Sequence, residues 1–312
     1  MKLVTFRSGK NEQVGALTDD GQVVELPAFA SMEALIAGGE RALDTARELA
    51  AKCQDDSTHP LDSVQLLAPL PCPPQMRDFL CFEKHLRQAF DAMIMTRAAQ
   101  ADEPEEEAQK LRDSGQFDIP EIWYRQPTYY KCNRFAVTGP DTDVVWPGYS
   151  NVIDYELEFA AVIGKRGTDI PRDQAADHIF GYTIFNDFSA RDAQAVEMEG
   201  RLGPAKGKDF DGANVLGPCI VTADEIGNPY ELEMTARING EEWSRGNSRD
   251  MYYTFEDLIA YVTQSETLHP GEVLGSGTVG NGCGLELGKF LQRGDTVELE
   301  VDKIGVLRNR VT

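Results

Sequence analysis

Two glutamates in the middle of the chain have the spacing of ligands on one face of a strand. Glu156 and Glu158 lie in the segment VIDYELEFAAVIG, residues 152–164, where large apolar side chains recur at every second position. Successive side chains of a strand point to opposite faces, so the two glutamates lie side by side, with Asp154 before them. Like charges so placed repel unless they are solvated or bind a cation. Such oxygen ligands suit Mg²⁺ or Mn²⁺, and also Ca²⁺.

A solvated sheet face is the simpler explanation of this spacing. The glutamates within residues 231–233 and 298–300 are also two positions apart. The face that carries Glu156 and Glu158 differs because it continues as Ala160 and Val162, so it is not polar throughout. On the residues alone, both explanations stay open.

A third carboxylate ends the next apolar segment. Asp187 closes YTIFND, residues 182–187, which has the composition of a strand. Ligands commonly bind at strand ends, although a plain helix N-cap is the alternative role for Asp187. On the helix expected at residues 189–199, Arg191 and Gln194 are three positions apart and therefore share a face. We expect that face to lie near the strand end.

Composition excludes several classes of function. The chain has 312 residues, with 30 Lys and Arg against 52 Asp and Glu, a formal net charge of −22. This excess disfavours binding to nucleic acid or to an anionic membrane surface, both of which need clustered cations. No apolar run approaches the roughly 18 residues of a membrane span, and no N-terminal apolar segment indicates export. The six cysteines form no C-x-x-C pair, so we expect free thiols and a cytoplasmic location.

The elements that must position these side chains follow from the local patterns. Residues 1–29 have the alternation of a β-meander and residues 31–52 that of a helix, and the proline-rich stretch 69–74 suggests a boundary. We therefore expect a small domain at 1–68 and a catalytic domain at 69–312. A helix over 79–95 precedes the acidic segment 96–115, which is either an exposed insertion or a mobile lid.

The remainder of the chain is rich in short strands. Strands are expected at 152–163, 180–187, 217–222, 231–239, 272–275 and 295–307, with short helices near 172–178, 189–199 and 254–264. Short strands punctuated by glycine favour an α+β fold with a mixed β-roll or barrel-like core over a doubly wound parallel sheet.

Five ordered motifs resemble the fumarylacetoacetate hydrolase superfamily over residues 70–312. They are D-Y-E-x-E-x-A-x-V-I-G (154–164), N-D-x-S-A-R-D-x-Q (186–194), L-G-P-x-x-G-K-x-F (202–210), P-G-E-V-L-x-x-G-T-V (270–279) and L-x-x-G-D-x-V-E-L-E-V-x-x-I-G-x-L-x-N (291–309). The resemblance implies a mixed β-roll core, a carboxylate-bound divalent cation, a small keto-acid or diketone substrate and a homodimer. Residues 1–68 are similar to the small N-terminal domain of many members.

The resemblance also implies roles for individual residues. Those implied to bind the metal are Glu156, Glu158 and Asp187, with Asp78 as a fourth carboxylate seven residues before a catalytic histidine. That histidine is His85, the general base, oriented by Glu286, while Lys208 stabilises an oxyanion, with Lys206 as the alternative lysine. The positions that resemble substrate contacts are Arg191, Gln194, Tyr130, Lys131 and Thr278.

Two departures from the family pattern bear on the reaction. The segment Phe79–Lys84 before the histidine has no hydroxyl side chain, and Gln88 stands where short members carry the glutamate of a His–Glu dyad. This favours pairing of His85 with Glu286. The expected reaction is hydrolysis of a C–C bond in a 1,3-diketone or diketo acid. The alternatives are a β-keto acid decarboxylase, hydratase or isomerase, and a non-catalytic cation-binding interaction protein.

Overall fold

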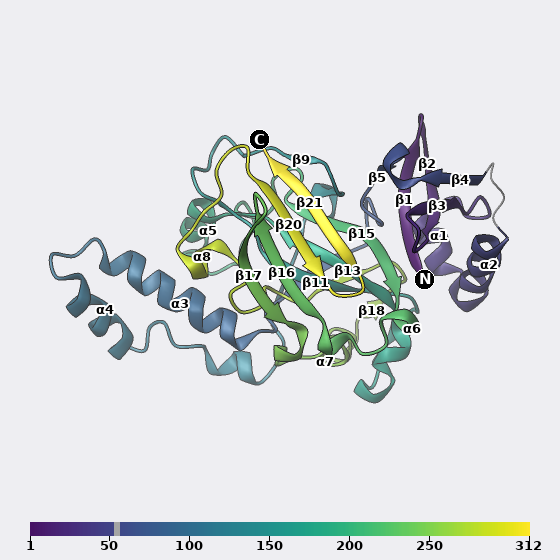
Figure 1. Ribbon diagram of the computed structural model, residues 1–312. Helices are drawn as coiled ribbons and strands as arrows, with labels where there is room; N and C mark the ends of the chain where they lie inside the picture. The colour runs from purple at the N-terminus through teal and green to yellow at the C-terminus, as the bar shows by residue number, and fades with distance from the viewer. Residues whose placement is uncertain (53–56) are drawn as a thin grey trace.

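The computed structural model describes residues 1–52 and 57–312 and shows a mixed α+β fold (Figure 1). Its main sheet runs, in hydrogen-bonded order, through β4 (Thr58–Pro60), β3 (Gln22–Glu25), β2 (Asn11–Leu17), β1 (Lys2–Ser8), β15 (Asn214–Thr222), β13 (Ile179–Asp187), β11 (Leu157–Ile163), β19 (Val273–Gly275), β6 (Met76–Phe79) and β7 (Tyr129–Lys131). Beside this path, β5 (Gln65–Leu66) pairs with β1 and β8 (Val137–Thr138) with β15. Among the described residues the path stays open and does not close into a barrel.

A second sheet covers one side of the first. It consists of β17 (Glu241–Asn247), β16 (Glu233–Ile238), β20 (Thr296–Val301), β21 (Gly305–Val311) and β9 (Asp143–Val144). Two short ladders pair β10 (Ile153–Asp154) with β14 (Ser189–Ala190) and β12 (Gly167–Thr168) with β18 (Thr267–Leu268). The α-helices are α1 (Met32–Ala37), α2 (Gly39–Ala51), α3 (Glu83–Ala98), α4 (Pro104–Asp113), α5 (Arg191–Met198), α6 (Ala223–Ile226), α7 (Phe255–Val262) and α8 (Gly284–Leu287). The segment expected as a helix at 172–178 is a 3₁₀ helix, Arg172–His178.

The alternation expected around residue 157 separates two hydrophobic cores. Tyr155, Leu157 and Phe159 pack into the core between the two sheets, whereas Ala160 and Val162 belong to a second core that includes side chains of α1 and α2. β11 is flanked by β13 and β19, so both of its edges are paired, and the two cores cover its two faces. The strand expected at 152–163 is divided into β10 and β11 by a short interruption at residues 155–156.

The N-terminal strands continue the main sheet. β1 pairs antiparallel with β15, with Lys2 opposite Val221 and Leu3 opposite Ile220. Figure 1 shows this part, in purple, at one side of the molecule with α1 and α2. The division at residues 68 and 69 stays a prediction.

The acidic segment 96–115 forms part of a helical hairpin. α4 packs against α3 through Ile94, Ala98, Ala108 and Leu111, and Figure 1 shows the pair projecting from the sheets. Its role as a lid stays a prediction. The described cysteines, Cys72, Cys81, Cys132, Cys219 and Cys283, are free thiols, while Cys53 lies outside the described residues. Within residues 1–52 and 57–312, no helix is long and apolar enough to cross a membrane.

Candidate active site

Three carboxylates from three strands converge on one face of the main sheet. Asp78 comes from β6, Glu158 from β11 and Asp187 from the end of β13. One oxygen from each lies within 4.8 Å of the other two, and all three residues are buried. β19 runs between β11 and β6 and presents Gly275 here, where a Cβ would lie 2.5 Å from Asp78 Oδ1. The absence of a side chain at Gly275 therefore leaves space for the cluster.

Burial and mutual repulsion destabilise the charged forms of these three carboxylates when no cation is bound. Burial and the charge of Asp187 raise the pKa of Asp78 to about 8. Burial and the charge of Asp78 raise the pKa of Glu158 well above its usual range, and burial raises the pKa of Asp187 to about 6 despite the nearby Lys208. Among the described residues, Glu158 Oε2 and Asp187 Oδ1 are buried without a hydrogen-bond partner. Unpaired buried acceptors of this kind fit a hard divalent cation.

Two hydroxyl groups orient the carboxylates. Tyr130 donates a hydrogen bond of 2.6 Å to Asp187 Oδ2, and Thr278 donates one of 3.2 Å to Glu158 Oε1. Burial raises the pKa of Tyr130 well above its usual value, so the phenol keeps its proton as a donor. The structure thus brings both predicted substrate contacts to the site, where they hold carboxylates.

Lys131 is not brought to this site. It follows Tyr130 on β7, so its side chain lies on the opposite face of that strand, and it is exposed. In the register of β6 and β7, Asp78 pairs with Tyr130 and Arg77 with Lys131.

Glu156 lies beside the cluster and holds two cationic side chains. Its Oε2 is 2.7 Å from Lys208 Nζ and its Oε1 is 2.8 Å from a terminal nitrogen of Arg191. Burial alone would raise the pKa of Glu156, but the charges of Lys208 and Arg191 lower it below its usual value. Lys208 also pairs with Asp187, and these two carboxylates raise its pKa although burial alone would lower it. Lys206 is exposed, so Lys208 is the lysine of the site.

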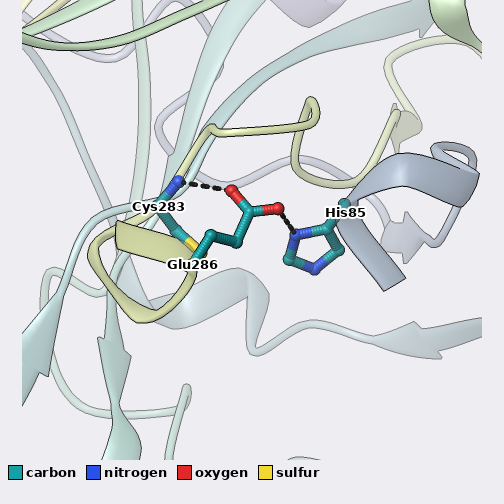
Figure 2. Close-up of side chains that lie close together, drawn as sticks. All are labelled: His85, Cys283 and Glu286. Carbon is teal, nitrogen blue, oxygen red and sulfur yellow. Dashed lines mark hydrogen bonds and ion pairs between the residues drawn. The ribbon is translucent and has the colours of Figure 1, made fainter. Parts of the chain in front are cut away.

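The predicted base and its orienting carboxylate meet at the first turn of α3. His85 Nδ1 lies 2.9 Å from Glu286 Oε1, and Figure 2 shows the other carboxylate oxygen facing the backbone nitrogen of Cys283, at 3.2 Å. The Glu286 side chain is fully buried. Gln88, one turn after His85, exchanges two hydrogen bonds with Asn281 and so fixes α3 against the loop before α8.

Asp154 connects this pair to the rest of the site, a role that the sequence did not indicate. Its carboxylate accepts hydrogen bonds from the backbone nitrogens of Gly284, at 2.7 Å, and Leu285, at 2.9 Å, which begin α8. It also accepts one of 2.9 Å from Arg191 Nε. Gly284 has no room for a side chain, since a Cβ would lie 2.5 Å from Asp154 Oδ1. Asp154 thus holds both the helix that carries Glu286 and the arginine that pairs with Glu156.

The helix α5 places the remaining predicted contacts. Gln194 accepts a hydrogen bond of 2.9 Å from Arg191, so both side chains are engaged within the protein. Glu197, one turn later, accepts hydrogen bonds from three consecutive backbone nitrogens, those of residues 205–207, at 2.7–2.9 Å. This loop leads directly to Lys208. Glu197 is therefore a second supporting carboxylate missed from the sequence.

Comparison with known proteins agrees with these features. The family model described as "Fumarylacetoacetate (FAA) hydrolase C-terminal" matches residues 77–312. The protein named oxaloacetate tautomerase YisK of Bacillus subtilis is 31% identical over 331 residues, covering 100% of both chains. The human mitochondrial oxaloacetate tautomerase FAHD2A is 38% identical over 188 residues, and this match spans 60% of the chain and 59% of the human protein.

Solved structures show the same fold. The structure of fumarylacetoacetate hydrolase from Exiguobacterium antarcticum aligns with a TM-score of 0.75 and 25% identity, covering 100% of this chain and 99% of that one. A probable 2-hydroxyhepta-2,4-diene-1,7-dioate isomerase from Mycobacterium abscessus aligns with a TM-score of 0.73 and 27% identity, covering 100% and 98%. The match over residues 77–312 and the end-to-end alignment with the Bacillus protein show that this chain belongs to the fumarylacetoacetate hydrolase family.

Proposed function

We propose that this protein is a divalent-cation-dependent enzyme that interconverts the enol and keto forms of a small 2-oxo dicarboxylic acid of the oxaloacetate type. The observation that carries the proposal is the buried pair of His85 and Glu286, 2.9 Å apart. It adjoins the carboxylate site through Cys283, whose backbone forms a β-bridge with that of Glu156. Relatives named oxaloacetate tautomerase, one aligned over its full length, support the substrate class.

The carboxylate cluster has the ligands for Mg²⁺ or Mn²⁺. Asp78, Glu158 and Asp187 would hold the ion, with Glu156 beside them. A bound divalent cation supplies Lewis-acid stabilisation of the negative charge that develops on the oxygen of an enolate. Lys208 keeps Glu156 and Asp187 in their charged forms, because it pairs with both.

His85 is the group we assign to proton transfer. Glu286 engages its Nδ1, which leaves Nε2 free for the substrate. In the ketonisation direction, Nε2 accepts the proton of the enol hydroxyl, and Glu286 stabilises the resulting imidazolium. Nε2 then delivers that proton to the adjacent carbon, which restores the neutral ring and yields the ketone. The substrate is neither oxidised nor cleaved, so no further reactant is required.

Hydrolytic cleavage of a C–C bond in a 1,3-diketone or diketo acid is the second candidate. The same observation favours it, because a histidine oriented by a buried carboxylate also activates water. Lys208 and Gln194 would then stabilise an oxyanion, which requires each to exchange a present partner for substrate. Tautomerisation needs no such exchange, and we therefore place it first.

A product assay distinguishes these functions. The purified protein is incubated with Mg²⁺ or Mn²⁺ and with enol oxaloacetate or an acylpyruvate, while enol absorbance and the ¹H NMR spectrum are followed. We expect accelerated formation of keto oxaloacetate, and a loss of rate of about 10²–10⁴-fold in His85→Ala. Cleavage of the acylpyruvate into two acids would establish the hydrolase instead. Decarboxylation would give pyruvate, and it should survive loss of the histidine. A wild-type rate in His85→Ala would exclude the assigned base.

The family resemblance also predicts a homodimer. Light scattering of the purified protein would test this expectation directly.

A further inference from the structure

A second group of potential metal ligands shares no residue with the carboxylate cluster. His85, Cys283 and Glu286 each offer one ligand atom, and these atoms lie within 4.8 Å of one another (Figure 2). They provide one nitrogen, one sulfur and one oxygen. Proton transfer as assigned above uses the histidine and the glutamate, and it gives no role to the thiol of Cys283.

The three side chains are already held in place. Cys283 is fully buried, as is the side chain of Glu286, and that of His85 is 9% exposed. One oxygen of Glu286 is bound to His85 and the other to the backbone nitrogen of Cys283. Gln88 and Asn281 fix the helix of His85 against the loop that leads to Cys283. A ligand set carried by such supported elements loses little conformational entropy when an ion binds.

Glu286 also lines a cavity between α3 and α8. This cavity has a volume of about 520 Å³, and its wall includes Gln88, Met95, Leu285 and Phe290. The side chain of Glu286 is itself fully buried, so the cavity reaches the ligand group only as far as the edge of that residue.

The donor atoms select the kind of ion. Mg²⁺ and Ca²⁺ take oxygen ligands, whereas Zn²⁺ takes thiolate, imidazole and carboxylate together and is commonly four-coordinate. Zn–S and Zn–N distances of about 2.0–2.3 Å place neighbouring ligand atoms of a tetrahedral site roughly 3.5 Å apart. His85 Nδ1 and Glu286 Oε1, now 2.9 Å apart, would therefore separate by about 0.6 Å to admit the ion, while all three ligand atoms already lie within 4.8 Å of one another. The oxygen-only cluster of Asp78, Glu158 and Asp187 has the opposite preference.

Proton balance sets the conditions for binding. Burial and the charge of Asp154 keep the pKa of the Cys283 thiol well above its usual value, so the metal-free protein holds a neutral thiol. An ion binds the thiolate, and the thiol proton passes to solvent. To bind the ion through the lone pair of Nδ1, His85 moves its ring hydrogen from Nδ1, where it faces Glu286 in the metal-free protein, to Nε2. The two negative charges of Cys283 and Glu286 then balance the charge of the ion.

We propose that His85, Cys283 and Glu286 form a second cation site, which binds Zn²⁺ with water as the fourth ligand and inhibits the enzyme. The bound ion occupies both members of the proton-transfer pair without displacing the activating cation. Inhibition rests on the proposed function, whereas binding does not. The closing experiment therefore has a readout that needs no turnover.

Co²⁺ serves as the spectroscopic probe for Zn²⁺ binding. It is added to the full-length protein already saturated with Mg²⁺, and the near-ultraviolet absorption of a thiolate–Co²⁺ bond is followed. We expect this band in the wild type and in Cys219→Ser, whose buried thiol lies on β15. It should be absent in Cys283→Ser and weakened at least tenfold in apparent affinity in His85→Ala. Equal bands in Cys283→Ser and the wild type would overturn the proposal, and circular dichroism of each variant verifies folding.

Inhibition is measured with Zn²⁺ at saturating Mg²⁺, each variant normalised to its own rate without Zn²⁺. We expect half-inhibition of the wild type and Cys219→Ser at a concentration at least tenfold lower than for Cys283→Ser or Cys283→Ala. Equal inhibition of the wild type and the three variants, together with a weaker inhibition at higher Mg²⁺ concentration, would show that Zn²⁺ competes for the carboxylate cluster. That result would refute the inhibitory site. If no variant turns over the substrate, the proposed function fails, and the Co²⁺ spectrum still decides whether the site exists.

Discussion

The substitution Asp154→Asn tests whether the site depends on its supporting carboxylate. Asp154 is fully buried and accepts hydrogen bonds from two backbone nitrogens of α8 and from Arg191. Asparagine has nearly the same shape but only one acceptor oxygen, and its amide group would face a donor. The change therefore removes the charge that opposes Arg191 and loosens the start of a four-residue helix that carries Glu286.

The expected magnitudes follow from these contacts. Removing one partner of a buried ion pair lowers the free energy of unfolding by about 3–5 kcal/mol. Arg191 keeps its contact of 2.8 Å with Glu156, so we expect the lower end, about 3 kcal/mol. A looser Glu286 orients His85 less well, and a loss of about 1.4–2.8 kcal/mol in transition-state stabilisation lowers kcat about 10–100-fold.

Thermal unfolding and steady-state kinetics with Mg²⁺ measure the two effects separately. We expect a lower Tm, a reduced kcat and nearly unchanged KM and Mg²⁺ affinity. Combining the substitution with Glu286→Gln should add little to the loss in kcat, because both act through the same group. Asp192→Asn is the matched control and should change kcat less than twofold, since the hydrogen bonds of Asp192 within residues 1–52 and 57–312 go to Ser150, Asn151 and Ala193 and not to α8. An unchanged kcat in Asp154→Asn, despite a lower Tm, would refute the positioning role.

Three further predictions concern the cation site and its supports. Glu158→Gln should abolish Mg²⁺ binding measured by calorimetry and also turnover, and full activity in excess chelator would contradict a metal role. The folded-state pKa of Asp78 is raised from 3.8 to about 8, so between these pH values the unfolded chain has lost a proton that the folded protein keeps. The Tm of the metal-free protein should therefore fall as pH rises from about 4 to about 8. Saturating Mg²⁺ or the substitution Asp78→Asn should flatten this fall. Glu197→Ala should lower kcat/KM about tenfold and expose residues 205–207 to proteolysis, because it removes all three amide hydrogen bonds. Glu197→Gln should be intermediate, because it removes one of the three. Identical digestion of both variants and the wild type would argue against this support.

The sequence predicted the strand face but not its burial. Alternation places Glu156 and Glu158 on one face, and the glutamates of 231–233 and 298–300 have the same spacing. The structure covers the first pair, because β11 lies between two strands and two cores, whereas Glu233 is exposed and pairs with Arg245. Which strand becomes central depends on pairings between distant segments, and local patterns do not encode these.

The supporting residues were missed for the same reason. Asp154 contacts α8 across more than a hundred residues of chain, and Gln88 contacts Asn281 over a similar separation. No local motif marks such contacts. The placement of Lys131 is different, because it adjoins Tyr130 on one strand, and alternation alone indicates that only one of the two faces the carboxylates.

Cation binding depends on the pairing register of β11, because the two faces of this strand belong to two different cores. A shift of one residue would exchange every side chain between its faces. Leu157 and Phe159 would then meet the partners of Glu158, and the carboxylate would enter an apolar core. A protein folded with that error could not assemble the ligand set. If the cluster binds Mg²⁺ as proposed, Mg²⁺ present during refolding would stabilise only correctly paired molecules and so select the native sheet from its misregistered alternatives.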